Sequence, residues 1–180
     1  MVSSSINVSE DHLGFLIGPK GQNKKLIERT GGVKLIIDEC MVTVTGEDGF
    51  KVMKATEVIR ALGEGLPLKK AFELFREDYQ LVIYDIEDAV VNKAALERQK
   101  GRIIGEKGKT KKYFERMLNL KIHISESKVI AVGPSDKLRI FRDALERLVH
   151  GAPHSGVYRY VETRLLHIRP QKAEIEAEIR

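Results

Sequence analysis

The sequence predicts an α+β fold made of two copies of one module. When the chain of 180 residues is shifted by 87 positions, residues 14–46 align with residues 101–133 without a gap and share 14 identities in 33 positions. Both copies show the same order of patterns, β-α-α-β-β-α, with a glycine-bounded loop between the first two helices. Helices in this order pack on one face of a small three-stranded antiparallel sheet, which places the chain in the α+β class.

In each copy, strands are expected where β-branched residues alternate with polar ones, and helices where apolar residues recur at helical spacing. In the first copy these patterns predict strands at 4–8, 33–37 and 41–45, and helices at 10–17, 22–29 and 48–62. In the second copy they predict strands at 80–86, 120–124 and 129–132, and helices at 92–104, 109–118 and 135–149.

Two breaker clusters divide the chain. Gly63 and Pro67 bound the first cluster, and Leu68, Ala71, Phe72 and Phe75 after it have the i, i+3, i+4, i+7 spacing of an amphipathic helix. We expect that helix to pack on one or both modules. The second cluster, Gly151-Ala-Pro, opens a helical tail that we expect Pro170 to interrupt. The expected domains are a first module at 1–63, a linker at 64–79, a second module at 80–150 and a tail at 151–180.

Composition excludes several classes of protein. The single Cys40 excludes an internal disulfide framework and a zinc site built on paired cysteines. No apolar run approaches 18 residues and the first residues lack a signal-peptide core, so we expect a soluble, cytoplasmic protein without a membrane partner. The formal net charge of +5 permits a nucleic-acid partner. Asn and Gln are few beside Lys, Glu and Arg, a bias typical of heat-adapted proteins.

The two glycine loops are the candidate binding site. A Gly-x-x-Gly loop lets another backbone come close because its ends carry no Cβ, and the helix N-terminus that follows favours anions such as phosphates. Residues 97–121 contain nine basic and three acidic side chains, so positive charge gathers at the second loop. The candidate contacts are Gly18, Pro19, Lys20, Gly21 and Lys24 in the first copy, and Arg102, Gly105, Glu106, Lys107, Gly108, Lys109 and Lys111 in the second.

Apolar residues beside the loops are candidates for contacts to bases. We expect Leu16 and Ile17, and likewise Ile103 and Ile104, to divide into one buried and one groove-lining residue. Ile36 alternates out of phase with its apolar neighbours on the hairpin, and His123 occupies the equivalent position in the second copy. Ile36 and His123 are therefore added to the candidate contacts.

Both loops resemble a known signature. Gly14-Phe-Leu-Ile-Gly-Pro-Lys-Gly21 and Gly101-Arg-Ile-Ile-Gly-Glu-Lys-Gly108 are similar to the G-x-I-I-G-x-x-G sequence of KH domains, which bind single-stranded RNA or DNA. The resemblance implies two type I (eukaryotic-type) KH domains in tandem. In that family the loop clamps the backbone of about four nucleotides while the bases lie in an adjacent groove. Glu106 departs from a purely basic loop and Pro19 removes a backbone donor.

A second resemblance is more specific. Gly133-Pro-Ser and the run Leu148-Val-His-Gly-Ala-Pro-His-Ser-Gly-Val-Tyr158 resemble the second KH domain and tail of the partner-of-Nob family, in an archaeal form without an N-terminal extension. The resemblance implies a non-enzymatic assembly factor that binds the 3′ region of 16S-type rRNA and positions it for a partner endonuclease on the pre-ribosomal small subunit. No cofactor and no metal are implied.

Other functions are weighed against this one. A general tandem-KH RNA binder in transcription or RNA degradation has the same loops, and a protein-interaction scaffold with an inactive KH groove would use the acidic linker and the tail. An enzyme is disfavoured because the sequence has no catalytic motif, and the P-loop-like Gly108-Lys-Thr has Ile103 where a glycine is required. The acidic side chains Asp78, Asp85, Glu87 and Asp88 are interpreted as a solvent-facing or docking patch and not as a magnesium site.

Overall fold

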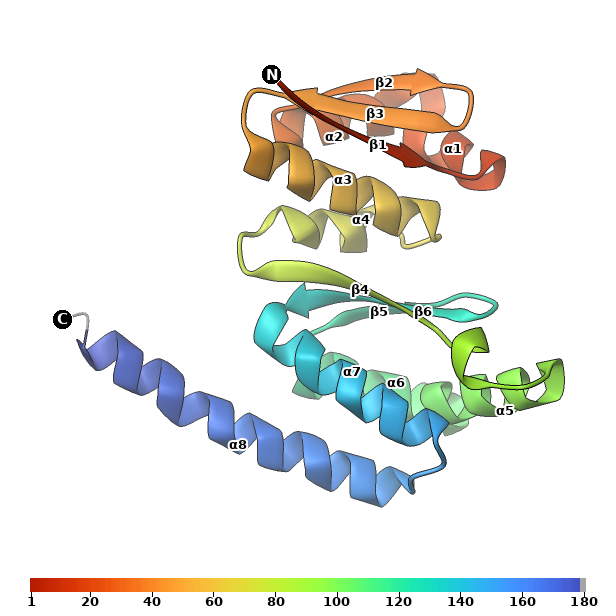
Figure 1. Cartoon of the computed structure of the whole chain (residues 1–180), viewed down its shortest axis with the longest axis vertical. Coiled ribbons are helices and arrows are strands. Elements are labelled where there is room, and N and C mark those ends of the chain that lie inside the picture. The colour runs from red at the N-terminus through yellow and green to blue at the C-terminus, as the bar shows by residue number, and fades with distance from the viewer. Residues whose placement is uncertain (179–180) are drawn as a thin grey trace.

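A computed structural model describes residues 1–178, with side chains up to residue 168. The first module contains β1 (Val2–Asn7), α1 (Glu10–Ile17), η1 (Pro19–Gly21), α2 (Gln22–Gly31), β2 (Lys34–Asp38), β3 (Met41–Gly46) and α3 (Gly49–Gly63). The linker contains α4 (Leu68–Ala71) and η2 (Phe72–Phe75). Figure 1 shows the two modules stacked along the long axis with the linker between them.

The second module repeats the order of the first. It contains β4 (Tyr79–Asp85), η3 (Glu87–Ala89), α5 (Lys93–Ile104), η4 (Glu106–Gly108), α6 (Lys109–Met117), β5 (Lys121–Ile124), β6 (Lys128–Pro134) and α7 (Ser135–Val149). The tail forms α8 (His154–Glu178) and runs along the far side of the second module (Figure 1).

Each module has the predicted three-stranded antiparallel sheet. The strand orders are β1-β3-β2 and β4-β6-β5, so the last strand of each hairpin lies in the middle. Val44 pairs with Ser4 on one side and Leu35 on the other, and Ile130 pairs with Ile83 and His123. The topology confirms the α+β class and the β-α-α-β-β-α order.

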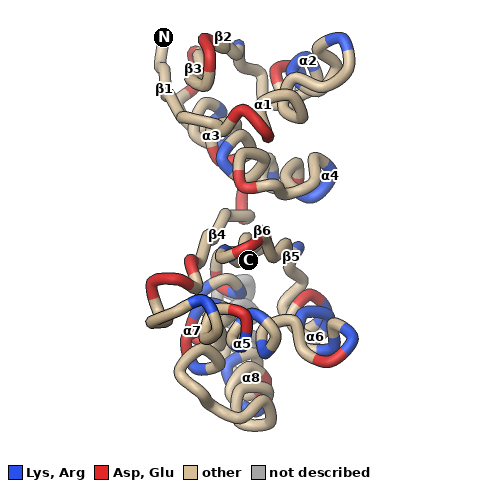
Figure 2. Tube along the Cα trace, turned by 90° about the vertical axis from the view of Figure 1, so that its right-hand side faces the viewer, with Lys and Arg blue, Asp and Glu red and all other residues tan. Residues whose placement is uncertain are grey.

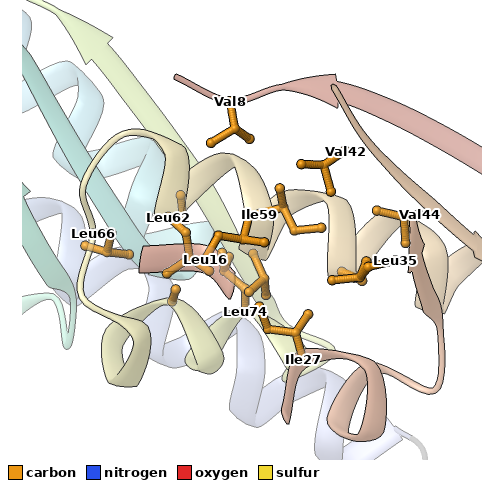
Figure 3. Packing of buried hydrophobic residues seen from close by; sticks show 14 of the residues in the cluster. Val8, Leu16, Ile27, Leu35, Val42, Val44, Ile59, Leu62, Leu66 and Leu74 are labelled. Atoms are coloured by element: carbon orange, nitrogen blue, oxygen red, sulfur yellow. The ribbon is translucent and has the colours of Figure 1, made fainter. Parts of the chain in front are cut away.

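The first core lies between the sheet and its helices. Because side chains alternate across a strand, Leu35, Val42 and Val44 all face α3, where Ile59 and Leu62 are fully buried. Figure 3 shows these residues together with Leu16 and Ile27 of α1 and α2, and with Leu66 and Leu74 of the linker. The core of the first module therefore continues into the linker.

The linker joins the two modules through one apolar cluster. Ala71 and Leu74 are fully buried, and the same cluster includes Ile130 and Val132 from the outer face of the second sheet. Lys128 reinforces the junction with an ion pair of 2.9 Å to Glu64. The predicted amphipathic segment thus packs on both modules, although its second half is a 3-10 turn and not a continuation of the α-helix.

The second core extends to the tail. Phe114 and Phe141 pack edge to face, with their ring centroids 5.2 Å apart, and Val157 and Val161 of α8 are buried in the same cluster. The expected interruption at Pro170 was wrong, because α8 continues to Glu178. A proline removes a single backbone donor, and the first turns of this helix are held by buried side chains, so the helix continues past Pro170.

Candidate nucleic-acid interface

The two glycine loops have the same backbone. Gly18 and Gly105 have φ values of 68° and 74°, and Gly21 and Gly108 have φ values of 73° and 75°. Between them, Lys20 and Lys107 both have φ of 51°, a left-handed conformation that is uncommon for residues other than glycine. Two segments of different sequence therefore adopt one strained shape, which marks the loops as functional candidates.

The two glycines of each loop have different surroundings. A Cβ on Gly105 would lie 2.3 Å from Oγ1 of Thr110, and a Cβ on Gly18 would lie 2.6 Å from Cγ of Asn23. A Cβ on Gly21 would meet nothing within 4 Å, and one on Gly108 would meet only Lys112 Cε, at 4.0 Å. The first glycine thus allows the loop to pack closely against its own module, whereas the second leaves an open face that another backbone can approach.

Exposed lysines surround both loops. Lys20, Lys107 and Lys109 are exposed, and Figure 2 shows basic segments at α2 and α6, the helices that follow the loops. Pro19 and Glu106 are exposed as well. The Glu106 carboxylate is therefore solvated, and salt screens its repulsion of a phosphate. The loop residues predicted from the sequence are therefore brought together at two surface sites.

Lys24 and Lys111 lie on the sides of α2 and α6 that face the edge strands. Lys24 Nζ is 3.9 Å from Glu28, and Lys111 Nζ is 3.9 Å from Glu115. Each carboxylate also accepts a backbone N–H of the edge strand, from Leu35 at 2.9 Å and from Ile122 at 3.1 Å. These two lysines consequently lie on the helix side that faces the edge strand, and each is already paired with a carboxylate.

Arg102 is directed to the tail and not to the loop. Its Nη2 donates to the carbonyl oxygen of Ala152, and its own carbonyl oxygen lies 3.0 Å from Nε2 of His154. The side chain is half-buried. The structure therefore separates Arg102 from the exposed lysines with which the sequence pattern grouped it.

Ile36 and His123 project from the sheet faces that are turned away from the helices. Ile36 is 59% exposed on the outer face of the first sheet. His123 is half-buried at the junction between the modules, beside Gly65 of the linker. A Cβ built on Gly65 would lie 3.5 Å from Nε2 of His123 and 3.3 Å from Nε2 of His12, so both imidazoles lie close to this glycine. Burial and the nearby charges of Lys70, Lys111 and His12 lower the pKa of His123. The structure does not bring either side chain to a glycine loop.

In each apolar pair before a loop, one residue is buried, as predicted. Leu16 and Ile103 are buried in the two cores, whereas Ile17 and Ile104 are partly exposed at the helix ends that enter the loops. Ile17 and Ile104 therefore keep part of their surface accessible to a ligand beside the loops.

The sequence did not predict that basic and aromatic side chains of α6 and α8 combine into one surface. The rings of Tyr113 on α6 and Tyr158 on α8 lie 4.1 Å apart, and Lys112 and Arg116 flank Tyr113 on the same helix. The helical spacing of Lys112, Tyr113 and Arg116 was a usable signal. The contact between Tyr158 and Tyr113 was not visible, because Tyr158 lies 45 residues beyond Tyr113 and reaches it only through the fold.

Comparison with known proteins identifies both modules. Residues 80–165 match the family model of the second PNO1 KH domain, described as a eukaryotic type KH-domain (KH-domain type I), and residues 3–61 match the KH domain model. A KH domain-containing protein of Methanocaldococcus jannaschii is 35% identical over 175 residues, covering 94% of this chain and 77% of that protein. The chain belongs to the PNO1/Dim2 family of tandem KH proteins.

Solved structures agree with this membership in the PNO1/Dim2 family. A protein of unknown function from Aeropyrum pernix has a TM-score of 0.92 and 34% identity, covering 98% of both chains. A chain from the a/eIF2alpha-aDim2p-rRNA complex of Pyrococcus horikoshii OT3 has a TM-score of 0.81 and 34% identity, covering 91% of this chain and 93% of that one. The pre-rRNA-processing protein PNO1 of Debaryomyces hansenii is 29% identical over 64% of this chain, which spans only 46% of that protein.

Among the residues that the structure describes, no group of three or more His, Cys, Asp or Glu side chains is placed to hold a metal ion. None of the helices in that part of the chain is long and apolar enough to cross a membrane.

Proposed function

We propose that this protein binds single-stranded RNA through its two glycine loops, and that its target is the 3′ region of small-subunit rRNA. The observation that carries the proposal is the repeated loop backbone, with a lysine in the left-handed conformation beside an open glycine. The choice of RNA is supported by two similar proteins, the pre-rRNA-processing protein PNO1 of Debaryomyces hansenii and the chain of the Pyrococcus horikoshii complex with rRNA.

The loop geometry suits a sugar-phosphate backbone. The open faces of Gly21 and Gly108 let a strand pass close to the protein, and the N-termini of α2 and α6 contribute partial positive charge to its phosphates. Lys20, Lys107 and Lys109 add full charges. Bases then lie in the groove between the helices and the edge strand, against Ile17 and Ile104.

The proposed role is to position RNA and not to cut it. The protein would hold the rRNA 3′ region on the pre-ribosomal small subunit in the cytoplasm while a partner endonuclease acts on it. Its binding units would be the modules at 1–63 and 80–150, joined by the linker at 64–79 and followed by the tail at 151–180. We assign no catalytic residue to the chain.

Fluorescence anisotropy with a labelled single-stranded RNA that matches the rRNA 3′ end tests the proposal. Two loop variants are needed, Pro19→Asp with Lys20→Asp and Glu106→Asp with Lys107→Asp, because aspartate tolerates the left-handed backbone while reversing the lysine charge. We expect at least one to weaken binding by about tenfold or more and to make the slope of affinity against salt shallower.

The controls decide what a loss of binding means. Lys93→Asp reverses an exposed charge at the start of α5, away from both loops, and should bind like the wild type. A duplex of the same sequence and an unrelated single strand should bind more weakly. Unchanged binding in both loop variants would contradict the loop assignment, and equal binding of the unrelated strand would contradict the rRNA target.

A further inference from the structure

One face of α6 forms a cavity with the tail. Lys109, Lys112, Tyr113 and Arg116 have the i, i+3, i+4, i+7 spacing that places side chains on a single helix face. Together with Tyr158 of α8 they line a cavity of about 630 Å³, which we call the tyrosine pocket. The pocket therefore combines three cations with two aromatic rings.

The two tyrosines are held in place by hydrogen bonds. Their ring centroids are 4.1 Å apart with 34° between the ring planes. The Tyr113 hydroxyl lies 3.2 Å from the carbonyl oxygen of Tyr158 and 3.4 Å from Oε1 of Glu162, and the Tyr158 hydroxyl lies 3.0 Å from Oγ1 of Thr110. Burial and the Glu162 charge raise the pKa of Tyr113 to about 12.

We propose that the tyrosine pocket binds one further nucleotide of the RNA strand that the second loop holds. The base stacks on the tyrosine rings, and Lys112 and Arg116 contact the adjoining phosphates. This inference rests on the proposed function and extends the binding site beyond the loop and its groove.

The chemistry of the pocket favours a nucleotide. Aromatic side chains next to a positively charged track are the means by which proteins bind single strands without reading their sequence, because every base has a face that can stack. Glu162 is the acidic side chain that contacts the pocket, at the Tyr113 hydroxyl, and it is outnumbered by Lys109, Lys112 and Arg116.

The pocket is continuous with the open side of the second loop. Lys109 directly follows Gly108, and Lys112 Cε lies 4.0 Å from the position of a Cβ on Gly108. A strand that crosses Gly108 therefore meets Lys112 next. Lys111 and Glu115 lie on the other side of α6, toward β5, so the pocket is separate from the contact between α6 and the edge strand.

The first module provides an internal control. Lys25 and Arg29 occupy the positions equivalent to Lys112 and Arg116, but Leu26 stands where the second module has Tyr113. The tail helix packs on the second module, as its buried residues show. Charge is thus conserved between the repeats at these positions, while the aromatic pair is found beside the second loop.

Stacking is tested with a fluorescent base. We would place 2-aminopurine at successive positions of an eight-nucleotide single-stranded RNA and measure its fluorescence with the full chain. At one position we expect the fluorescence to be quenched in the wild type and in Tyr113→Phe, because both keep the ring. We expect no quenching in Tyr113→Leu, which carries the leucine that the first module has at the equivalent position. The affinity of Tyr113→Leu for this RNA should fall about fivefold or more.

Matched charge variants test the position of the strand. Lys112→Glu with Arg116→Glu should weaken binding of the eight-nucleotide RNA by about tenfold, and more than Lys25→Glu with Arg29→Glu. Binding of a four-nucleotide RNA, measured by competition, should be the same in Tyr113→Leu and the wild type, because it fills only the loop site.

The outcomes separate the two proposals. If the loop variants lose binding while Tyr113→Leu keeps both its affinity and the quenching, the tyrosine pocket is not a nucleotide site and the loop function stands. If Tyr113→Phe loses quenching as fully as Tyr113→Leu, the hydroxyl holds the tail and the rings do not stack on a base. If the wild type binds neither RNA, both proposals are wrong.

Discussion

Single backbone angles decide which residues the loops accept. Gly105 has φ 74° and ψ 167°, a region almost restricted to glycine, whereas Gly108 has φ 75° and ψ 17°, which other residues adopt at a cost. Lys107 illustrates that cost, because it holds φ 51° next to Gly108. The first glycine therefore chiefly stabilises the fold, and the second chiefly allows contact with a ligand.

Replacing each glycine of the second loop by alanine separates these roles. Gly105→Ala should lower the free energy of unfolding by about 2 kcal/mol or more, because strain adds to the clash with Thr110. Gly108→Ala should cost only about 1–2 kcal/mol. Urea denaturation measures both, and anisotropy should show that Gly108→Ala still weakens RNA binding. Equal destabilisation by the two variants would contradict this division.

His123 makes stability depend on pH. Its pKa is lowered in the folded protein, so the unfolded chain takes up the proton more readily. Stability from this group is complete above the ordinary histidine pKa of about 6.5 and decreases as pH falls below it. We expect the loss of unfolding free energy between pH 7 and pH 5 to be smaller in His123→Gln than in the wild type. A loss of the same size in both proteins would show that His123 does not contribute.

At the scale of elements, a repeated carboxylate fastens each second helix to its edge strand. Glu28 and Glu115 accept the N–H groups of Leu35 and Ile122, which are buried residues of β2 and β5. In the second module Lys70 from the linker joins this contact, 3.5 Å from Glu115 and 2.9 Å from the carbonyl oxygen of Ile122. The contact therefore holds each edge strand against the helix that follows its glycine loop.

Removing the Glu115 carboxylate tests this fastening. Glu115→Ala should lower the free energy of unfolding by about 1–3 kcal/mol, because the buried N–H of Ile122 loses its acceptor. Glu115→Gln should cost less, since its amide oxygen can still accept. Urea denaturation of the two variants gives the comparison. If Glu115→Gln is as unstable as Glu115→Ala, the loss of stability comes from the missing charge and not from the missing hydrogen bond.

The elements were predictable where local patterns determine them. The glycines of the loops, the alternation in β3 and the helical spacing in α6 predicted both modules nearly in register with the structure. Arg102 and His123 were placed less well, because their surroundings come from distant residues: Ala152 of the tail for Arg102, and Gly65 of the linker for His123. Local spacing carries no information about such contacts.

At the scale of the whole molecule, one apolar cluster connects the two modules. Leu74 is fully buried in a cluster that includes Leu62 of the first module and Val132 of the second. Because this cluster spans the junction, the modules keep a fixed relative position. The two loops consequently keep a fixed position relative to one another.

This connection predicts a single unfolding transition. The five tyrosines occupy positions 79, 84, 113, 158 and 160, so tyrosine fluorescence reports on the second half of the chain while far-UV circular dichroism reports on all of it. Both signals should change at the same urea concentration, and Leu74→Ala should shift both by about 2–5 kcal/mol of stability. Separate transitions for the two signals would contradict a shared core.

Cross-linking tests the central claim most directly. A single-stranded RNA matching the rRNA 3′ end, with 4-thiouridine at each position in turn, would be irradiated with the protein and the linked peptides mapped by mass spectrometry. The account predicts links at residues 18–25 and 105–116, the two loops and the helix starts that follow them. Links confined to the acidic segment around Glu87 and Asp88, or to the outer face of the first sheet at Ile36, would contradict it.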